Sequence, residues 1–371
     1  MLVGVPKEIK GDEYRVGLVP QTVGQLGAAG HRVFIETGAG EGSGISDQDY
    51  VRAGATIVSS ADDVFNAALL IVKVKEPLRD ERAKLRRGQA IFTYLHLAAD
   101  PEQARDLLHS GVTAIAYETV TDLAGRLPLL APMSRIAGRM AGQVAAHFLE
   151  RPQGGRGILL GAVDGGAPAE VVVFGGGVVG SNAALMASAM GANVTVTVKT
   201  EQSAQRLRRQ FDGDISVLTA PDDAVSLCER ADVVIGAALV VGGSAPKLIS
   251  ADAVRQMKPG SVIVDVSIDQ GGCAETSHPT PHSHPTFIVN GVIHYCVANM
   301  PGAVPRTSTF ALNDATRPFV LALANKGIGA ALADDPDLRN GLNIHDGKVT
   351  HRAVADALGL AYTPADEALR L

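Results

Sequence analysis

Short apolar runs alternate with stretches of helical spacing over the first third of the chain. Runs at residues 2–5, 32–35, 69–74, 90–95 and 113–116 are predicted strands, and helical patterns lie between them. Strands that alternate with helices form a parallel sheet with helices on both faces. We therefore expect residues 1–128 to build one α/β domain.

A second series of the same kind follows a long predicted helix at residues 132–149, where apolar and small side chains recur at helical spacing. A glycine-rich stretch at residues 154–166 separates this helix from the new series. Its predicted strands lie at residues 171–174, 194–198, 233–235, 262–266 and 287–289. The remainder, from Arg306, is mostly helical in pattern and too short for a core of its own. We expect it to pack back onto the first domain.

Length and composition narrow the class of protein. The chain has 371 residues, which is more than one core usually supports, and its net charge of −6 comes without a cluster of basic residues. Three cysteines lie far apart, without metal-ligand spacing, and predict reduced structural thiols and no metal site. Because signal-peptide and membrane-span patterns are absent from the sequence, we expect a cytoplasmic protein with neither nucleic acid nor membrane as partner.

The predicted strand at residues 171–174 leads directly into the glycine pattern Gly175-x-Gly177-x-x-Gly180, and a predicted helix follows at residues 181–190. The first glycine permits a tight turn, the second lets the backbone approach a pyrophosphate, and the third lets the helix pack on the strand. The helix N-terminus then offers N–H groups to the phosphates. Since strand, loop, helix and next strand occur in this order, we predict a dinucleotide site of the Rossmann type.

The predicted fold class is therefore α/β with two domains. A Rossmann dinucleotide-binding domain at residues 129–305 is inserted in a discontinuous, Rossmann-like substrate domain formed by residues 1–128 plus 306–371.

The strand after the glycine motif lacks the acidic residue that normally holds the ribose hydroxyls of NAD about 20 positions on. The sequence reads Val198, Lys199 and Thr200 there, and Arg206, Arg208 and Arg209 follow on the next predicted helix. Positive charge at this place suits a 2′-phosphate, so the sequence favours NADP(H) over NAD(H) as the NAD(P)H cofactor. In the alternative interpretation, Lys199 is a solvated loop residue and Glu201 reaches the ribose.

Six segments in order are similar to those of one enzyme family: residues 13–16 (EYRV), 73–77 (KVKEP), 93–98 (TYLHLA), 131–134 (APMS), 265–273 (DVSIDQGGC) and 297–301 (VANMP). Together they resemble the alanine dehydrogenase family over essentially the whole chain. The resemblance implies a two-domain enzyme, usually a homohexamer, that reversibly converts L-alanine, water and NAD to pyruvate, ammonium and NADH. The partners it implies are a small 2-oxo acid or amino acid, and ammonium.

The reduction of a 2-oxo acid needs a cation for the carboxylate, a proton donor for the carbonyl or imine, and an aligned nicotinamide. Arg15 offers a bidentate fork for a carboxylate, and Lys75 a compact charge near the keto oxygen. His96 follows a buried strand, where an imidazole suits a proton shuttle. The resemblance implies the same roles. Taken alone, Arg15 also fits an ordinary surface cation, Lys75 a charged strand end, and His96 a structural histidine.

The resemblance extends to further residues. It implies that Asp269 acts in catalysis beside the nicotinamide, although aspartate also favours a turn of the kind that precedes Gly271. Tyr94 and Asn299 are implied as substrate-binding residues. The implied cofactor-binding residues are Ser134, Gly175, Gly177, Val178, Val179, Gly180, Val198, Lys199, Leu239, Val240, Ile268, Asp269, Asn299 and Met300.

Two departures from the family pattern leave alternatives open. Arg135 stands where the family generally has glutamate. The acidic residue expected at the end of the predicted strand at residues 194–198 is missing. Either change fits a new coenzyme preference, a different 2-oxo acid or relaxed function. A dinucleotide-binding, transhydrogenase-like subunit and a cofactor-binding paralogue without catalysis are the alternative hypotheses.

Overall fold

The computed structural model describes residues 1–220, 224–238 and 245–370. It divides into two compact units, one formed by Met1–Pro132 with Gly302–Leu371 and the other by Met133–Pro301. The fold is α/β, with the second unit inserted in the first along the chain. The division falls after residues 132 and 301, whereas the sequence analysis set it after residues 128 and 305.

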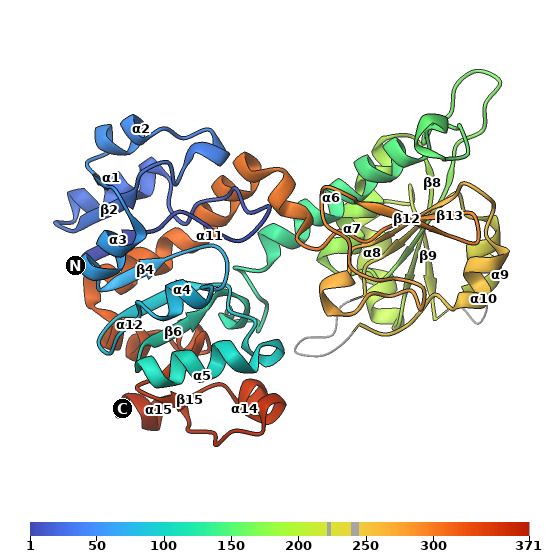
Figure 1. Cartoon of the computed structure of the whole chain (residues 1–371). Helices are drawn as coiled ribbons and strands as arrows, with labels where there is room; N and C mark the ends of the chain where they lie inside the picture. The colour runs from blue at the N-terminus through green and yellow to red at the C-terminus, as the bar shows by residue number, and fades with distance from the viewer. Residues whose placement is uncertain (221–223, 239–244, 371) are drawn as a thin grey trace. The chain divides into compact units, whose positions relative to one another are not determined.

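An eight-stranded sheet forms the centre of the first unit within the described residues (Figure 1). The parallel strands lie in the order β3-β2-β1-β4-β5-β6. From β1 the chain adds strands outward on one side, and from β4 it adds them on the other side, so the strand order reverses between β1 and β4. This is the doubly wound pattern, in which ligands bind beyond the carboxyl ends of the strands at the reversal. The strands are β1 (Leu2–Val5), β2 (Arg32–Glu36), β3 (Thr56–Val58), β4 (Leu70–Val72), β5 (Ala90–Thr93) and β6 (Thr113–Ala116).

Helices connect these strands and continue after the inserted unit. Pro at the first position and a Ser or Asp N-cap begin several of them, as in α5, where Asp100 accepts the backbone N–H of Gln103 at 2.9 Å. The helices are α1 (Pro20–Ala28), α2 (Asp47–Arg52), α3 (Ala61–Ala67), α4 (Arg79–Arg82), α5 (Pro101–Ser110), α11 (Pro305–Lys326), α12 (Ile328–Asp334), α13 (Pro336–Arg339), α14 (Arg352–Leu358) and α15 (Ala365–Leu369).

The C-terminal segment packs back onto the first unit, as expected from the sequence. Strand β14 (Leu342–His345) pairs antiparallel with β6, and β15 (Lys348–Val349) pairs with β14. The segment also enters the core of this unit, because Ile344 and Val354 belong to one buried cluster with Ile91 of β5. The prediction of a mostly helical segment missed these two strands, which are too short to show alternation.

The second unit contains a seven-stranded sheet in the described part of the chain. Its parallel strands follow the order β9-β8-β7-β10-β11-β13, so the reversal lies between β7 and β10. They are β7 (Glu170–Phe174), β8 (Asn193–Val198), β9 (Ser216–Thr219), β10 (Val233–Gly236), β11 (Val262–Asp265) and β13 (Val292–Tyr295), and β12 (Thr286–Val289) adds an antiparallel edge. Strands β7, β10, β11 and β13 are buried over almost their whole length, as parallel strands covered on both faces must be, whereas the edge strands β9 and β12 are partly exposed.

The last two strands form a hairpin that the sequence analysis described incompletely. It predicted one strand at residues 287–289, whereas β12 and β13 pair across Asn290 and Gly291. Both turn residues have positive φ angles, of 51° and 78°, which Asn-Gly adopts readily. The other predicted strands are found within two residues of their predicted ends. The short edge strands β3 and β9 were missed.

The helices of the second unit include one correction. They are α6 (Ala131–Phe148), which begins just before the division, α7 (Val178–Ala189), α8 (Glu201–Phe211), α9 (Ala224–Arg230) and α10 (Ala251–Gln256). The prediction that the helix after the glycine motif begins at Ser181 is wrong, because it begins at Val178 with Gly177 as N-cap. The last two variable positions of the motif thus belong to the first helical turn.

The three cysteines, Cys228, Cys273 and Cys296, are buried free thiols. Burial raises the pKa of Cys228 and of Cys296 to about 12. These thiols therefore stay protonated near neutral pH. Among the described helices, none combines the length and the apolar character that a membrane crossing requires.

The packing of β14 predicts a measurable loss of stability in Ile344→Ala. Ile344 is fully buried, so truncation leaves a cavity and lowers the free energy of unfolding by about 2–5 kcal/mol. Urea denaturation followed by circular dichroism measures this. Ile288→Ala is the matched control, because the side chain of Ile288 is 64% exposed and its loss should change stability by less than about 0.5 kcal/mol. Equal effects of the two changes would contradict the placement of the C-terminal segment in the core.

Candidate active site

Arg15, Lys75 and His96 follow three neighbouring strands of the first sheet. Arg15 lies in the loop after β1, Lys75 after β4 and His96 after β5, and the sheet order places β4 between the other two strands. Parallel strands present their carboxyl ends at one edge of the sheet. The prediction that all three residues follow strand ends is therefore confirmed.

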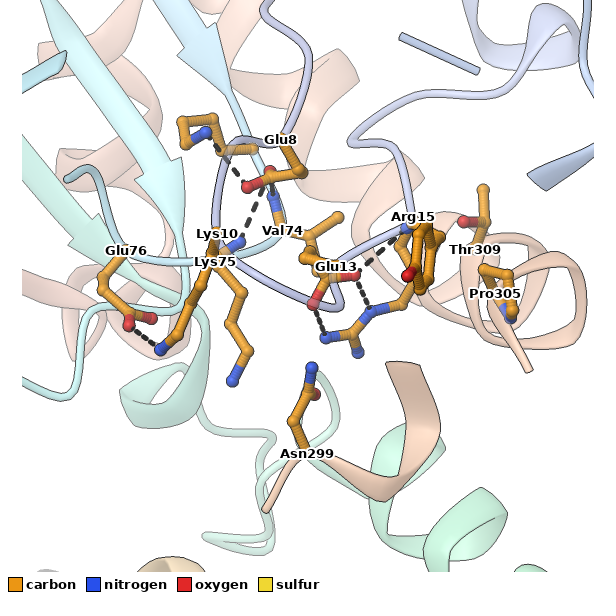
Figure 2. A network of polar contacts seen from close by, with 12 residues as sticks. Glu8, Lys10, Glu13, Arg15, Val74, Lys75, Glu76, Asn299, Pro305 and Thr309 are labelled. Atoms are coloured by element: carbon orange, nitrogen blue, oxygen red, sulfur yellow. Dashed lines mark hydrogen bonds and ion pairs between the residues drawn. The ribbon is translucent and has the colours of Figure 1, made fainter. Parts of the chain in front are cut away.

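Arg15 is a buried cation held by Glu13, as Figure 2 shows. Its side chain is 2% exposed, its Nε donates to Oε1 of Glu13 at 2.6 Å, and its Nη2 donates to Oε2. Burial lowers the pKa of Arg15, but the hydrogen bonds and charge of Glu13 outweigh it, so the pKa is raised. The interpretation of Arg15 as an ordinary surface cation is therefore wrong.

Buried charges fix the loop that carries Lys75. Lys73 lies between two carboxylates, with its Nζ 3.0 Å from Oε2 of Glu8 and 2.7 Å from Oε1 of Glu81. The other oxygen of Glu8 accepts the backbone N–H of Val74 at 2.7 Å and that of Lys75 at 3.4 Å (Figure 2). Glu8 thereby ties the segment that leads to Arg15 to the strand end that carries Lys75.

Two further contacts hold the same loop. Lys10 forms an ion pair with Glu76, the residue after Lys75 (Figure 2). On the other side, Oγ1 of Thr93 donates to the carbonyl oxygen of Lys75 at 2.8 Å. The backbone of half-buried Lys75 is thus held by neighbouring segments on both sides, which limits where its ammonium group can lie.

His96 occupies an unusual backbone conformation. Its φ angle is 51°, in the left-handed region that few residues other than glycine adopt, and its side chain is 49% exposed. The imidazole stacks on the ring of Tyr94, with centroids 5.8 Å apart. The Tyr94 hydroxyl donates to the carbonyl oxygen of Leu129 at 2.6 Å. Tyr94 therefore supports the imidazole, and its predicted contact with substrate stays a prediction.

The three motif glycines of the second unit have different surroundings. A Cβ atom at Gly175, whose φ is 107°, would lie 2.6 Å from the carbonyl oxygen of Ala237, and one at Gly180 only 1.8 Å from that of Gly175. A Cβ at Gly177 would meet no atom within 4 Å. The packing of the protein thus requires the first and third glycines. The open space at the second is what a pyrophosphate close to the backbone needs, so the loop fits the predicted dinucleotide.

Helix α7 begins at this loop with no side-chain cap, so the first-turn N–H groups of Val178 and Val179 suit a phosphate. Helix α6 packs closely on that turn, since a Cβ at Gly138 would lie 2.3 Å from the carbonyl oxygen of Val179. Ser134 lies one turn earlier on the same face of α6. Half-buried Ser134 is thus close to the phosphate loop, and exposed Arg135 follows it.

Both residues of the two interpretations of the ribose site lie just after β8. The carboxylate of Glu201 accepts hydrogen bonds from Nη1 of Arg208 and Oγ1 of Thr219, both at 2.7 Å. These bonds lower the pKa of Glu201 and direct its carboxylate toward β9. Lys199 is exposed directly after buried Val198. The role of either residue at the ribose stays a prediction.

Asp269 follows the end of β11, as the glycine loop follows β7 and Lys199 follows β8. It is exposed in a short 3-10 helix, Ile268–Gln270, that follows β11. The carboxylate of Asp265, at the end of β11, accepts the backbone N–H groups of Cys273 and Ala274 at 2.8 and 3.0 Å and so closes this loop. Both predicted roles of Asp269, as a residue that forms a turn and as a site residue, agree with this position.

Asn299 and Met300 follow β13 at the same edge of the sheet. Asn299 has a φ angle of 60°, and Met300 is buried. The predicted cofactor residues Leu239 and Val240 lie outside the described residues.

Sequence reasoning missed two residues that shape these sites and did not foresee one contact of a third. Glu13 belongs to a motif that was noticed, but only the structure shows that it pairs with Arg15. Glu118 binds the backbone of His96 from the end of β6, a strand that was predicted without a site residue. Arg206 was expected near the ribose, and its Nη2 donates to the carbonyl oxygen of Gly176 in the glycine loop at 2.7 Å. A carboxylate just after a predicted strand is the signal that could have pointed to Glu118.

An open dinucleotide loop on a Rossmann sheet, and a second α/β unit with a histidine and two cations at its strand ends, are typical of a two-domain, dinucleotide-dependent enzyme. The family models match nearly the whole chain: alanine dehydrogenase/PNT, N-terminal domain, at residues 4–137, and alanine dehydrogenase/PNT, C-terminal domain, at residues 141–352. The chain belongs to this family.

Individual relatives agree with that assignment. The chain is 56% identical to an alanine dehydrogenase of Halomonas elongata, over 98% of this chain and 99% of the relative. It is 52% identical to the alanine dehydrogenase of Bacillus subtilis, over 100% and 98%. A solved L-alanine dehydrogenase superposes with a TM-score of 0.93 at 51% identity, covering 97% of this chain and 99% of that one. A solved transhydrogenase from Sinorhizobium meliloti superposes with a TM-score of 0.82 at 25% identity, covering 95% of this chain and 100% of that one.

The glycine loop predicts that Gly180→Ala weakens dinucleotide binding. A Cβ atom 1.8 Å from a backbone oxygen forces the start of α7 to move, which misplaces the phosphate-binding N–H groups. We expect the affinity for NAD(P)H to fall roughly 10- to 100-fold, as for other small misplacements. Fluorescence titration measures this. Gly27→Ala in α1 is the control, because a Cβ there meets no atom within 4 Å. Unchanged affinity in Gly180→Ala would contradict the site.

Proposed function

We propose that this protein is an alanine dehydrogenase that catalyses the reversible reductive amination of pyruvate with ammonium and NAD(P)H. One observation carries the proposal: a fixed arginine, a lysine and a histidine follow the ends of three adjacent strands in a chain that matches alanine dehydrogenases over its whole length. The greater identity to alanine dehydrogenases than to the transhydrogenase supports this reaction over a transhydrogenase-like role.

In this proposal, the first unit binds and polarises the substrate. Arg15, held rigidly by Glu13, binds the substrate carboxylate, since a guanidinium that is already oriented loses little entropy on binding. Lys75 places its ammonium group beside the keto oxygen and stabilises negative charge that develops there. The fixed backbone of its loop keeps that charge in place.

Protons pass through His96. In the direction of amination its imidazolium donates a proton to the oxygen of the former carbonyl group, which leaves as water. In the reverse direction the neutral imidazole accepts a proton from the attacking water. Its half-exposed position allows it to recover its protonation state from solvent. Asp269 orients the amino or imino group. Residues 175–180 with Ser134 hold the dinucleotide, which supplies or accepts the hydride when bound.

The direct experiment is a small matrix of rates: NADH and NADPH against a panel of 2-oxo acids, each with and without ammonium. Oxidation of the reduced cofactor that needs both pyruvate and ammonium supports the proposal. Oxidation without ammonium points to another reaction, and no oxidation with any acid of the panel indicates a cofactor-binding paralogue without catalysis.

His96→Ala should remove most activity and leave cofactor binding intact. Loss of a general acid or base costs roughly 10²- to 10⁴-fold in kcat. Steady-state kinetics with pyruvate and ammonium measures this, and NAD(P)H titration serves as the binding control. His109→Ala, in the last turn of α5, is the matched histidine variant and should keep the wild-type rate. A wild-type rate in His96→Ala removes His96 from the mechanism.

We also infer a preference for NADP(H) over NAD(H). Val198 replaces the ribose-binding acid, exposed Lys199 follows it, and the carboxylate of Glu201 is engaged elsewhere. A 2′-phosphate beside Lys199 therefore gains a cation and meets no opposing carboxylate at the position of Val198.

Lys199→Ala should raise KM for NADPH about tenfold and change KM for NADH little, because only the 2′-phosphate needs the charge. Val198→Asp should reverse the preference, since an acid there binds ribose hydroxyls and repels phosphate. Lys348→Ala, an exposed lysine of β15, is the control. A wild-type protein that clearly prefers NADH contradicts this inference.

We further propose that the protein works as a homohexamer in the cytoplasm, which rests on the family resemblance alone. Light scattering coupled to gel filtration tests the oligomeric state, and a monomer would overturn it.

A further inference from the structure

Glu118 lies where it can act on His96 without touching the substrate. It belongs to a short 3-10 helix, Tyr117–Thr119, that follows β6, the strand next to β5. Its side chain is 14% exposed. Oε1 accepts the backbone N–H of His96 at 2.6 Å, and both oxygens accept that of Leu95, at 3.3 and 3.2 Å.

These hydrogen bonds offset a conformational cost. A left-handed backbone at a residue other than glycine is unfavourable by roughly 1–2 kcal/mol and persists only where the surroundings enforce it. Two consecutive N–H groups that converge on one carboxylate supply that constraint at residues 95 and 96. The direction in which the His96 ring leaves the chain therefore depends on Glu118.

The same carboxylate also lies near the His96 ring, since Oε1 of Glu118 is 4.0 Å from Nδ1 of His96. We propose that Glu118 is a positioning residue for His96, which fixes the orientation of the imidazole through the two backbone N–H groups whose hydrogen bonds it accepts. This inference rests on the proposed role of His96 in proton transfer.

Neighbouring groups pack on the same loop. Tyr94 stacks on the ring of His96, and Asp100 ends the helical turn that begins after His96. Helix α14 packs on that turn through Leu97, and His351 stands at the N-cap of this helix.

Three substitutions test the hydrogen bonds that Glu118 accepts. Glu118→Gln keeps an acceptor oxygen and the length of the side chain but removes the charge. Glu118→Asp keeps the carboxylate but shortens the side chain by one methylene group. Glu118→Ala removes the carboxylate altogether. Glu102→Gln is the matched control, because Glu102 is a 60% exposed carboxylate of α5 that pairs with Arg82. Circular dichroism and NAD(P)H titration establish that each variant folds and binds the cofactor.

The backbone contact is tested by NMR of the His96 amide in protein with ¹⁵N-labelled histidine, the signal being assigned with His96→Ala. We expect this resonance to move in Glu118→Ala and to stay close to its wild-type position in Glu118→Gln and Glu102→Gln, because only Glu118→Ala removes the acceptor of the His96 N–H. This measurement needs no turnover, so it separates failure of the inference from failure of the proposed reaction.

The positioning is tested by kcat with pyruvate and ammonium. We expect roughly a 10- to 100-fold loss in Glu118→Ala, as for other misplaced catalytic groups, and partial recovery in Glu118→Asp. A His96 amide resonance that does not move in Glu118→Ala overturns the proposal. A wild-type kcat in Glu118→Ala overturns it as well, and a wild-type kcat in His96→Ala shows instead that the proposed mechanism has failed.

Discussion

The parallel order of the strands is the constraint on which both candidate sites depend. Because βαβ connections run each strand in the same direction, the loops after the strands gather at one edge of a sheet. Residues far apart in sequence, such as Arg15, Lys75 and His96, thereby become neighbours by strand order. The glycine loop, Lys199 and Asp269 share such an edge in the second unit.

Charged groups at the edge of the first sheet are held by other buried charges. Arg15 is paired with Glu13, and Lys73 lies between Glu8 and Glu81. A buried charge without a partner is strongly destabilising, so each cation at this edge requires its carboxylate. The gain is a set of groups whose positions change little during a reaction, which is how an enzyme stabilises developing charge at low cost.

Much of this architecture could be predicted from the sequence. Alternating strands and helices, the glycine pattern and the helix at residues 132–149 are local signals, and the structure contains each of them. The pairing of strands from distant parts of the chain was harder to predict. The antiparallel addition of β14 to β6 joins segments more than 200 residues apart, and the short strands give no alternation to read. The partners of Glu13 and Glu118 could not be predicted, because they arise only from what the fold places beside these residues.

In the proposed reaction, hydride passes between the nicotinamide and the α-carbon of alanine. Reduced nicotinamide cofactor that carries deuterium at both hydrogens of C4 follows this transfer while the protein converts pyruvate and ammonium. NMR should then find deuterium at the α-carbon of L-alanine. Alanine without deuterium, or deuterated lactate in place of alanine, would show that the proposed hydride transfer does not take place.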